Sequence, residues 1–370
     1  MAQMGLIIMG SSPLPLQIFT GFFVTLFSIF FLAKIAPKLK LVDSPSPRKR
    51  HEGNVPLVGG LAIYIALITG GLIWGDSHQT LITANNINAL WIFISAGGLL
   101  VLVGTLDDRF KLSVTIRVLS ETAAALIVIE GLDLDLRNLG ALLGGGSIQL
   151  PSFIAYPFTL IAIFGIINAF NMLDGLDGLL GSLVLFTLIC FHIFTETYPG
   201  FLTSFIAASI LAFLISNLSV SRIIPKTFLG DAGSRLLGFI VVCLLLAAAS
   251  SQVGREKLIQ PVTALYITAL PLFDMSCTVL RRIHLKRSPF LADRSHIHHL
   301  MQALGFSNRR ALVIIIFLSS IFSSFGLLLN RFDTSEALQF LLFLSCFAGY
   351  CLMMNQAWRS VQRLDKLMEK

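Results

Sequence analysis

The sequence is poor in charge. Of its 370 residues only 13% are Asp, Glu, Lys or Arg, whereas 55% are apolar, and the mean hydropathy is +0.82. One run of 36 residues, 138–173, contains no charged side chain. Soluble domains carry about a quarter charged residues, so this composition excludes the soluble class. It predicts an all-α polytopic membrane protein.

Cysteine is scarce as well, and basic residues are absent from the start of the chain. The five cysteines all fall within long apolar segments and show no CxxC spacing. A disulfide framework or a zinc site made by cysteines needs thiols at paired spacings, so we interpret these cysteines as small apolar packing residues. The first basic residue is Lys34. We therefore expect the first apolar segment to be a retained helix instead of a signal peptide.

Apolar segments long enough to cross a bilayer recur along the whole chain. A hydrocarbon core about 30 Å thick needs roughly 20 apolar residues per helix. The candidate segments are 13–35, 56–75, 89–106, 114–131, 154–172, 178–195, 201–217, 232–250, 261–280, 309–330 and 337–355. We therefore expect a single integral membrane domain over 1–370 with about eleven transmembrane helices.

Lys and Arg indicate the orientation, because cytoplasmic loops carry the excess of positive charge. With the N-terminus outside, only Arg137, Arg255, Lys257 and Arg331 of the 27 basic residues fall in outward loops. The net charge of +7 then lies where anionic headgroups and cytosolic substrates are found, so we expect no nucleic-acid partner. A Gly-rich outward segment, NLGALLGGGSIQLPSF, is a candidate for a small hairpin on the outer face.

Four polar stretches lie on the expected inner face, and the first is TLDDRFKLS. Asp107 and Asp108 end the third apolar segment. A negative charge is disfavoured at a helix C-terminus, and adjacent acids repel, so this placement needs a positive partner. Either Asp108 or Ser113 caps the next helix, or one acid is poised as a base while the other acid, or Lys111, handles metal or phosphate.

The second stretch, NAFNMLDGLDG, ends the uncharged run. Asn171, Asp174 and Asp177 are three residues apart, so on a helix they face one side and offer three oxygen ligands suited to Mg²⁺. Gly175 and Gly178 would let a ligand approach the backbone closely. The alternative is an Asp-Gly turn at the end of a helix.

The third stretch is FLGDAGS, residues 228–234, which precedes the eighth apolar segment. A lone acid in this position is usually an N-cap, and Asp231 fits that role. The functional alternative makes Asp231 a metal ligand beside the aromatic ring of Phe228. The glycines would then admit a phosphate to the helix N-terminus.

The fourth stretch, RRIHLKRSPFLADRSHIHH, covers 281–299 and is strongly basic. His296, His298 and His299 suggest zinc, but the spacing is not HExxH, no cysteine lies near, and five Arg or Lys residues, Arg294 among them, would repel a cation. A solvated loop is a second interpretation. Imidazole and guanidinium donors fit a diphosphate best.

A smaller basic run contains Arg48 and His51 and precedes the second apolar segment. It either contributes to the same anion pocket or anchors a helix at anionic lipid. Taken together, acids for a hard metal, a candidate base and a basic cluster all lie on the cytosolic side of a membrane protein. This combination predicts phosphoryl transfer between a phosphorylated cytosolic metabolite and a lipid.

These stretches resemble the polyprenyl-phosphate N-acetylhexosamine-1-phosphate transferases over residues 48–300. The matching motifs occur in the family's order and spacing: PLVGG at 56–60, LDDRF at 106–110, NAFNMLDGLDGLLG at 168–181, FLGDAGS at 228–234 and SPF with DRSHIHHL at 288–300. The last motif is similar to the branch of WecA and the teichoic-acid-initiating enzymes, which uses UDP-N-acetylglucosamine. The branch that makes peptidoglycan lipid I has three adjacent histidines, and here Ile297 interrupts the run.

The resemblance implies transfer of N-acetylglucosamine 1-phosphate from UDP-N-acetylglucosamine to undecaprenyl phosphate, with release of UMP. The reaction would be the first membrane step of a cell-surface polysaccharide, at the cytoplasmic face of the bacterial inner membrane. Carried over by position, the resemblance implies that Asp231 and Asn171 hold Mg²⁺, for which Mn²⁺ can substitute, with the catalytic Asp174 close by. Asp107 or Asp108 would deprotonate or position the lipid phosphate. The uracil would be held by Asp177 and Phe228, and the diphosphate and sugar by Arg294, His296, His298 and His299. A phosphate monoester is largely ionised at neutral pH, so we expect positioning and charge neutralisation from the Asp pair.

Several alternatives stay open. Lys111 stands where related transferases carry an acid, which leaves room for another UDP-N-acetylhexosamine, and direct attack competes with a covalent aspartyl intermediate. A second copy of the chain is a further candidate partner, and the basic tail 358–370 is expected on the inner leaflet. A proton-coupled transporter would need acids in mid-span; Asp274 favours it, although Arg281 and Arg282 could pair with that acid. A lipid phosphatase would need an outward nucleophile, and none is evident.

Overall fold

The computed structural model describes residues 14–44, 53–74, 87–196, 200–250, 257–289 and 294–368. The chain divides into two compact units, each assembled from two separate stretches. The first unit is Met1–Leu134 with Thr197–Ala247, and the second is Asp135–Glu196 with Ala248–Lys370. A single transferase domain over 1–370 stays a prediction.

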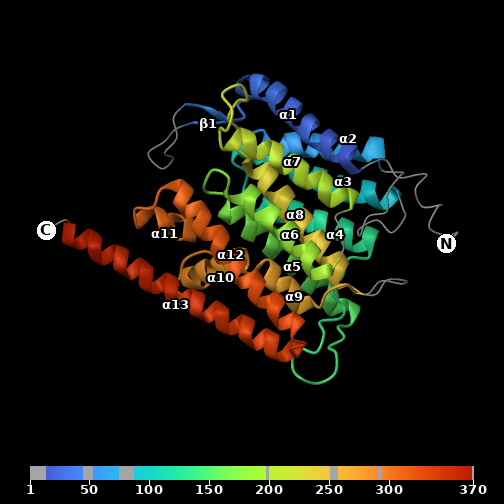
Figure 1. Ribbon diagram of the computed structural model, residues 1–370, viewed down its shortest axis with the longest axis vertical. Helices are drawn as coiled ribbons and strands as arrows, with labels where there is room; N and C mark the ends of the chain where they lie inside the picture. Colours follow the sequence, from blue (N-terminus) through green and yellow to red (C-terminus); the bar gives the residue numbers. More distant parts are fainter. Residues whose placement is uncertain are drawn as a thin grey trace. The chain divides into compact units, whose positions relative to one another are not determined.

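The first unit is built almost entirely from helices. Its elements are α1 (Leu14–Leu39), β1 (Val42–Asp43), β2 (Val55–Pro56), α2 (Gly59–Trp74), α3 (Ile87–Phe110), α4 (Val114–Leu132), α7 (Phe201–Asn217) and α8 (Gly230–Ala249). Helix α1 packs against α2 and α7, and α3 packs along α4 (Figure 1). Large apolar side chains of this unit face outward, as expected for a surface in contact with lipid. Phe27, for example, is 72% exposed.

A small backbone network joins two sequence motifs of the first unit. Strands β1 and β2 pair antiparallel, and the next residue, Leu57, forms a parallel bridge with Phe228. The Phe228 N–H donates to the Pro56 carbonyl oxygen at 2.9 Å, and the Gly59 N–H donates to the Phe228 carbonyl oxygen at 2.9 Å. These bonds tie the start of α2, in PLVGG, to the start of α8, in FLGDAGS.

Glycine allows this junction to close. A Cβ atom on Gly60 would overlap the backbone of Gly233, and a Cβ atom on Gly104 would overlap the backbone of Ala232. Small residues let helix backbones approach closely in a membrane protein. Gly60 of PLVGG, Gly233 of FLGDAGS and Gly104 of α3 therefore allow α2 and α3 to pack closely on α8. The role of the FLGDAGS glycines toward a phosphate stays a prediction.

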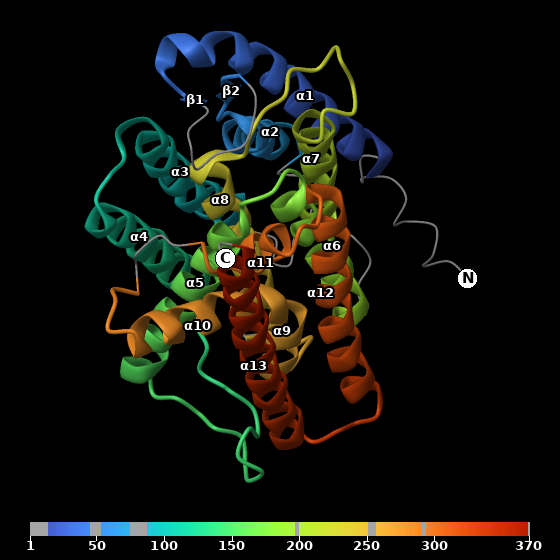
Figure 2. The same ribbon diagram turned by 90° about the vertical axis from the view of Figure 1, so that its left-hand side faces the viewer.

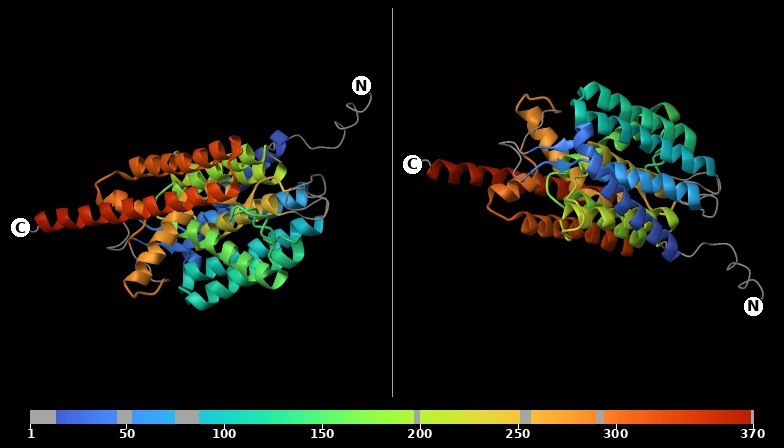
Figure 3. Two further views of the ribbon diagram at one scale, coloured as in Figure 1. Left: turned by 90° about the horizontal axis from the view of Figure 1, so that it is seen from below. Right: turned by 90° about the horizontal axis from the view of Figure 1, so that it is seen from above.

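The second unit packs its helices around one apolar core. Its elements are α5 (Ser152–Leu173), α6 (Leu179–Thr195), α9 (Pro261–Ile267), α10 (Ala269–His284), α11 (Ile297–Ala303), α12 (Asn308–Arg331) and α13 (Glu336–Met368). Tyr266, Phe273 and Tyr350 lie at the centre of the core. Helix α13 contacts α9, α10 and α11 (Figure 2), and its C-terminal end extends beyond α11 (Figure 3).

The Gly-rich segment of the second unit forms the hairpin that the sequence predicted. The Leu139 N–H donates to the Ile148 carbonyl oxygen at 3.0 Å, and the Ile148 N–H donates to the Gly140 carbonyl oxygen at 2.9 Å. The Glu336 carboxylate, at the start of α13, accepts the Ala141 N–H at 2.8 Å and fixes the tip of the hairpin. The side of the membrane on which it lies stays a prediction.

The predicted apolar segments are all helical in the described part of the chain, which confirms a polytopic all-helical membrane protein. Six of these helices are long and apolar enough to cross a membrane, or seven if α9 and α10, which are bent by 83° at Thr268, count as one span. Helices α2, α6 and α7 are apolar but have 16 or 17 residues, and α4 carries Arg117, Glu121 and Glu130. The count of eleven spans therefore stays a prediction.

Candidate active site

Asp108 bonds the start of another helix. Asp107 and Asp108 lie in the last turn of α3, and Asp231 lies in the first turn of α8. The Asp108 Oδ1 atom accepts the backbone N–H of Asp231 at 3.1 Å. The N-terminus of a helix carries unpaired N–H groups and a positive partial charge, so α8 supplies the positive partner that the end of α3 lacks. Ser113, whose hydroxyl accepts the Ile116 N–H, is the cap of α4.

Asp107 is fixed by ion pairs. It is 2% exposed, and its Oδ2 atom lies 2.8 Å from Nη2 of Arg235 and 3.6 Å from Nη1 of Arg117. Its Oδ1 atom accepts the Leu112 N–H at 2.7 Å. Both oxygens of this carboxylate are engaged, so Asp107 organises the cluster.

Arg235 is the residue that the sequence interpretation missed. It is 1% exposed, and besides Asp107 it lies near Glu121, with Nε to Oε1 at 3.7 Å, and near Asp231, with Nη2 to Oδ2 at 3.9 Å. A signal was available, because Arg235 follows Asp231 by four residues in an otherwise uncharged apolar helix. A buried arginine in a membrane helix needs acidic partners.

Lys111 completes the cluster from the turn between α3 and α4. Its backbone is left-handed (φ 54°), and its N–H donates to the Asp107 carbonyl oxygen at 2.8 Å. Its ammonium charge acts on both Asp108 and Asp231. The carboxylates of Asp107, Asp108, Glu121 and Asp231 thus outnumber the basic groups of Arg117, Arg235 and Lys111 by one.

This cluster fits a divalent cation. The Asp108 Oδ2 atom is buried and has no hydrogen-bond partner, although buried polar atoms are almost always paired. The charge balance is negative, and Asp231 is adjacent. Among the described residues no group of three or more His, Cys, Asp or Glu side chains is arranged to hold a metal. A cation here would take further ligands from water and phosphate, as Mg²⁺ commonly does.

Asn171, Asp174 and Asp177 do not share a helix face in the second unit. Helix α5 ends at Leu173, and Asp174 is its C-cap residue with φ −75° and ψ 62°. Asp177 lies in the turn before α6, next to Gly178 at φ 79°. The prediction of one helical face was therefore wrong, and the alternative of an Asp-Gly turn at a helix end is the one observed.

The structure brings this turn onto the histidine motif of the same unit. A Cβ atom on Gly175 would overlap Nε2 of His298, so DGLDG and DRSHIHH are in direct contact. The rings of His298 and His299 lie 4.1 Å apart, and those of His296 and His298 are parallel at 6.0 Å. Gly175 is the residue that makes room for the imidazole.

His298 and His299 have lowered pKa values. Burial, aided by the neighbouring charges of His299 and His296, lowers the pKa of His298 to about 3, and burial also lowers the pKa of His299. Nδ1 of His298 is buried without a hydrogen-bond partner. An anion would therefore meet N–H groups here, and the positive charge of the segment comes from arginines such as the exposed Arg294.

Asp274, the acid that favoured a transporter, is part of this same histidine region. It is fully buried, and its carboxylate is bonded to His296, to the backbone of Ile297 and to Tyr350. The suggested pairing with Arg281 or Arg282 is replaced by these contacts. An acid so fully engaged offers no support for proton relay through the membrane.

Some predicted roles join residues of different units. Asp231 and Asn171, proposed to share a metal, belong to the first and second unit, and so do Phe228 and Asp177, proposed to share the uracil. Their joint roles stay predictions. Arg48 and His51 lie outside the described residues.

Comparison with known proteins decides the family. A model of glycosyl transferase family 4 matches residues 90–249. Undecaprenyl-phosphate α-N-acetylglucosaminyl 1-phosphate transferases are similar over nearly the whole chain: that of Escherichia coli O157:H7 is 37% identical over 94% of this chain and 92% of its own, that of Yersinia pestis 38% over 94% of each, and that of Haemophilus influenzae 34% over 96% and 98%. The chain belongs to this transferase family.

The extent of these matches agrees with the geometry. The family model spans the acidic cluster and the turn after α5 and ends before the histidine motif. The similarity to the transferases extends over 94% of the chain and therefore also includes the histidine region. Both groups of polar residues therefore lie within the part of the chain that the transferase relatives share.

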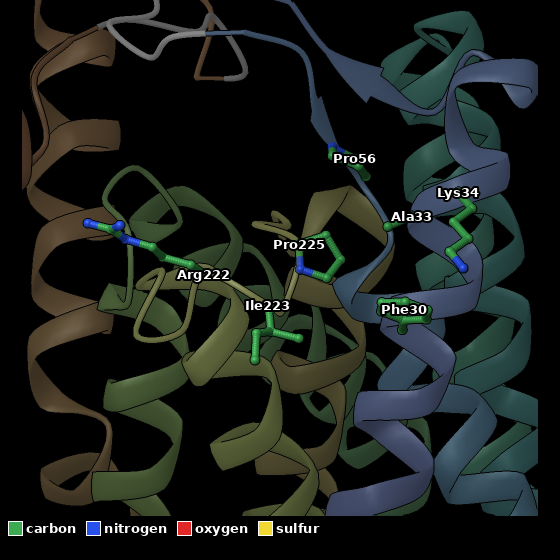
Figure 4. A pocket seen from close by; sticks show the side chains of 7 residues that line it. All are labelled: Phe30, Ala33, Lys34, Pro56, Arg222, Ile223 and Pro225. Carbon is green, nitrogen blue, oxygen red and sulfur yellow. The ribbon is translucent and has the colours of Figure 1, made fainter.

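A hollow of about 350 Å³ on the first unit lies apart from these residues (Figure 4). Its apolar wall is formed by Phe30, Ala33, Pro56, Ile223 and Pro225, and Lys34 and Arg222 stand on opposite sides of it. None of the acids assigned to this transferase's chemistry lines it. The acidic cluster and the histidine region are therefore the candidate sites of the chemistry.

Proposed function

We propose that the protein transfers N-acetylglucosamine 1-phosphate from UDP-N-acetylglucosamine to undecaprenyl phosphate, releasing UMP and leaving undecaprenyl-diphosphate N-acetylglucosamine. The observation that carries this function is the acidic cluster of the first unit, in which Asp108 keeps a buried carboxylate oxygen without a partner beside Asp231. This arrangement occurs in a chain that aligns with transferases of this activity over 94% of its length. The product is the first lipid-linked intermediate of a cell-surface polysaccharide.

In this reaction an oxygen of the lipid phosphate attacks the sugar-linked phosphorus of the UDP-sugar. A new phosphorus–oxygen bond forms, the diphosphate bond to UMP breaks, and UMP leaves with both electrons of that bond. Both substrates are already ionised at neutral pH, so no strong base is needed. The protein has to bring like charges together and hold them in line.

The acidic cluster supports a division of roles between its members. Asp108 and Asp231 would hold Mg²⁺, and Asn171 is proposed as a further ligand. When bound, the cation neutralises phosphate oxygens and the charge that develops on the leaving group. Asp107 holds Arg235 and Arg117 in place, and Lys111 adds a mobile positive charge for a phosphate.

The histidine region would bind the diphosphate and sugar. Neutral His298 and His299 offer N–H donors, and Arg294 offers a guanidinium that can bind two phosphate oxygens at once. Asp174 adjoins Gly175, which contacts His298, and is proposed to act with this group. Asp177 and Phe228 are proposed to hold the uracil.

We further propose that these loops face the cytoplasm of a bacterium and that the protein resides in its inner membrane. The distribution of Lys and Arg supports this orientation, and a UDP-sugar is a cytosolic metabolite. A second copy of the chain stays a proposed partner that the oligomeric state in detergent would test.

The test uses purified protein with undecaprenyl phosphate, Mg²⁺ and radiolabelled UDP-N-acetylglucosamine. We expect labelled lipid and UMP in equal amounts, with activity abolished by a chelator and restored by Mg²⁺ or Mn²⁺. Parallel reactions with UDP-N-acetylgalactosamine show whether another N-acetylhexosamine is preferred. If none of these sugars yields labelled lipid or UMP, the proposed function is wrong.

A further inference from the structure

Asp274 is a buried carboxylate to which the proposed reaction gives no direct role. It lies on α10, is 0% exposed, and is surrounded by the apolar core that contains Phe273 and Tyr350. An ionised carboxylate is costly in such surroundings unless hydrogen bonds compensate it. The three groups that bond the Asp274 carboxylate therefore indicate its role.

The donors fix the direction of each bond. The Asp274 Oδ1 atom accepts the Ile297 N–H at 2.8 Å and the Tyr350 hydroxyl at 2.8 Å, and its Oδ2 atom lies 2.7 Å from Nδ1 of His296. A carboxylate that already accepts two bonds on one oxygen is held in its acceptor form. The third bond is then made by the proton on Nδ1 of His296.

One ring nitrogen of His296 is thereby left for a ligand. With the proton on Nδ1 held by Asp274, Nε2 is the atom that can contact a substrate oxygen or exchange a proton. A second hydrogen bond of this kind commonly sets which nitrogen of a catalytic histidine is protonated. His296 is 5% exposed, so its ring cannot readily turn to exchange the two nitrogens.

Helix α13 bonds two neighbours of His296. Tyr350 bonds Asp274, and eight residues later the Trp358 indole N–H donates to the Ser295 carbonyl oxygen at 3.2 Å. These two contacts, about two turns apart on one helix, bracket His296 through Asp274 and through the preceding peptide. The motifs of the sequence end before α13, yet α13 completes the surroundings of His296.

We propose that Asp274 and Tyr350 are positioning residues for the transfer reaction, because they hold His296 protonated on Nδ1 and present Nε2 to the diphosphate of the UDP-sugar. The inference rests on the proposed function in one respect only, the identity of the anion that Nε2 meets. Asp274 acts through His296, and Tyr350 acts through Asp274.

The first measurement reads the tautomer directly and needs no turnover. In protein labelled with ¹⁵N-histidine, the His296 signals are identified by their loss in His296→Gln. We expect Nδ1 protonated in the wild type and a changed pattern in Asp274→Asn, whose amide cannot accept from all three donors. If wild-type His296 carries its proton on Nε2, the inference is overturned even where the transfer assay succeeds.

The second measurement compares two buried tyrosines that bond different partners. Tyr350→Phe removes the bond to Asp274, and Tyr266→Phe removes an equally buried bond to the Gln339 carbonyl oxygen at 2.7 Å in the same unit. We expect Tyr350→Phe to lower kcat about 10-fold and Asp274→Asn about 100-fold or more, the scale expected when a histidine loses the partner that fixes its tautomer. KM for UDP-N-acetylglucosamine should change little.

The control separates positioning from folding. Tyr266→Phe should lower the unfolding temperature as much as Tyr350→Phe does and leave kcat near the wild-type value. Equal losses of kcat in both tyrosine variants would overturn the inference, as would full activity in Tyr350→Phe. If wild-type protein makes no labelled lipid, the proposed function fails, and the tautomer measurement still decides on Asp274.

Discussion

The buried Arg235 offers the sharpest test of the acidic cluster. Arg235→Met keeps most of the side-chain volume and removes the positive charge. It leaves Asp107 and Glu121, each 3% exposed or less by residue, without the guanidinium that lies 2.8 Å and 3.7 Å away. Asp231, whose side chain is 34% exposed, keeps access to water and contributes little to the effect.

The magnitude follows from what remains after the change. Removing one partner of a buried ion pair costs about 3–5 kcal/mol, because an uncompensated buried charge is left behind. In a unit of this size each kcal/mol lowers the unfolding temperature by about 2–4 °C, so we expect a fall of roughly 6 °C or more. The matched control is Arg331→Met, which breaks a 3.8 Å pair with Glu196 in which the two side chains are 64% and 75% exposed. It should cost about 0–1 kcal/mol.

The assay is thermal unfolding of the detergent-solubilised variants, followed by tryptophan fluorescence. The double variant Arg235→Met with Glu121→Gln should recover part of the lost unfolding temperature, because the buried negative charge of Glu121 is removed. Equal unfolding temperatures for Arg235→Met and Arg331→Met would refute the view that Arg235 compensates buried acids. The absence of any recovery in the double variant would refute the part assigned to Glu121.

Four further predictions concern the site. Gly175→Ala should displace the ring of His298 and lower kcat by at least ~10-fold. Gly165→Ala, in α5, should not, because the added Cβ atom would meet only Met275, at 4.0 Å; initial rates with the UDP-sugar decide. The pKa of His298 is about 3 in the folded protein and about 6.5 in the unfolded chain, so between these pH values only the unfolded chain binds the proton. The free energy of unfolding should therefore fall by up to about 1.4 kcal/mol per pH unit as the pH drops below 6.5. A His298→Gln variant whose unfolding temperature falls equally with pH would contradict this. Asp231→Asn should lose most activity while still inserting and folding, and near-normal rates would exclude it as a metal ligand. Loss of His299 should weaken turnover more than UMP binding, measured by calorimetry; equal losses would place the histidine on the nucleotide.

Much of the fold could be predicted from hydropathy alone, because each buried or lipid-facing helix must satisfy its own backbone. Every expected apolar segment is helical, and the hairpin after Arg137 is present. The number of spans is not fixed by this argument. Apolar length leaves helices of 16 or 17 residues such as α6 undecided, and hydropathy does not reveal the 83° bend at Thr268.

The polar residues were found because charge is conspicuous in an apolar chain, but their partners were not. The sequence marked Asp107 and Asp108 as a costly pair, and only the packing of α3 on α8 shows Asp108 bonded to the start of α8 and Asp107 bonded to Arg235. The helical face proposed for Asn171, Asp174 and Asp177 was wrong because a spacing of three residues is periodic only if the helix continues.

The sequence by itself determined the membrane class, the segments that become helices, the motifs and, through them, the transferase family, because composition and local periodicity are properties of the chain. Tertiary structure decided which charges compensate one another. Arg235 and Asp107 are 128 residues apart, and Asp274 and Tyr350 are 76 apart. A buried charge is stable only beside its partner, and partners at such separations are brought together by packing.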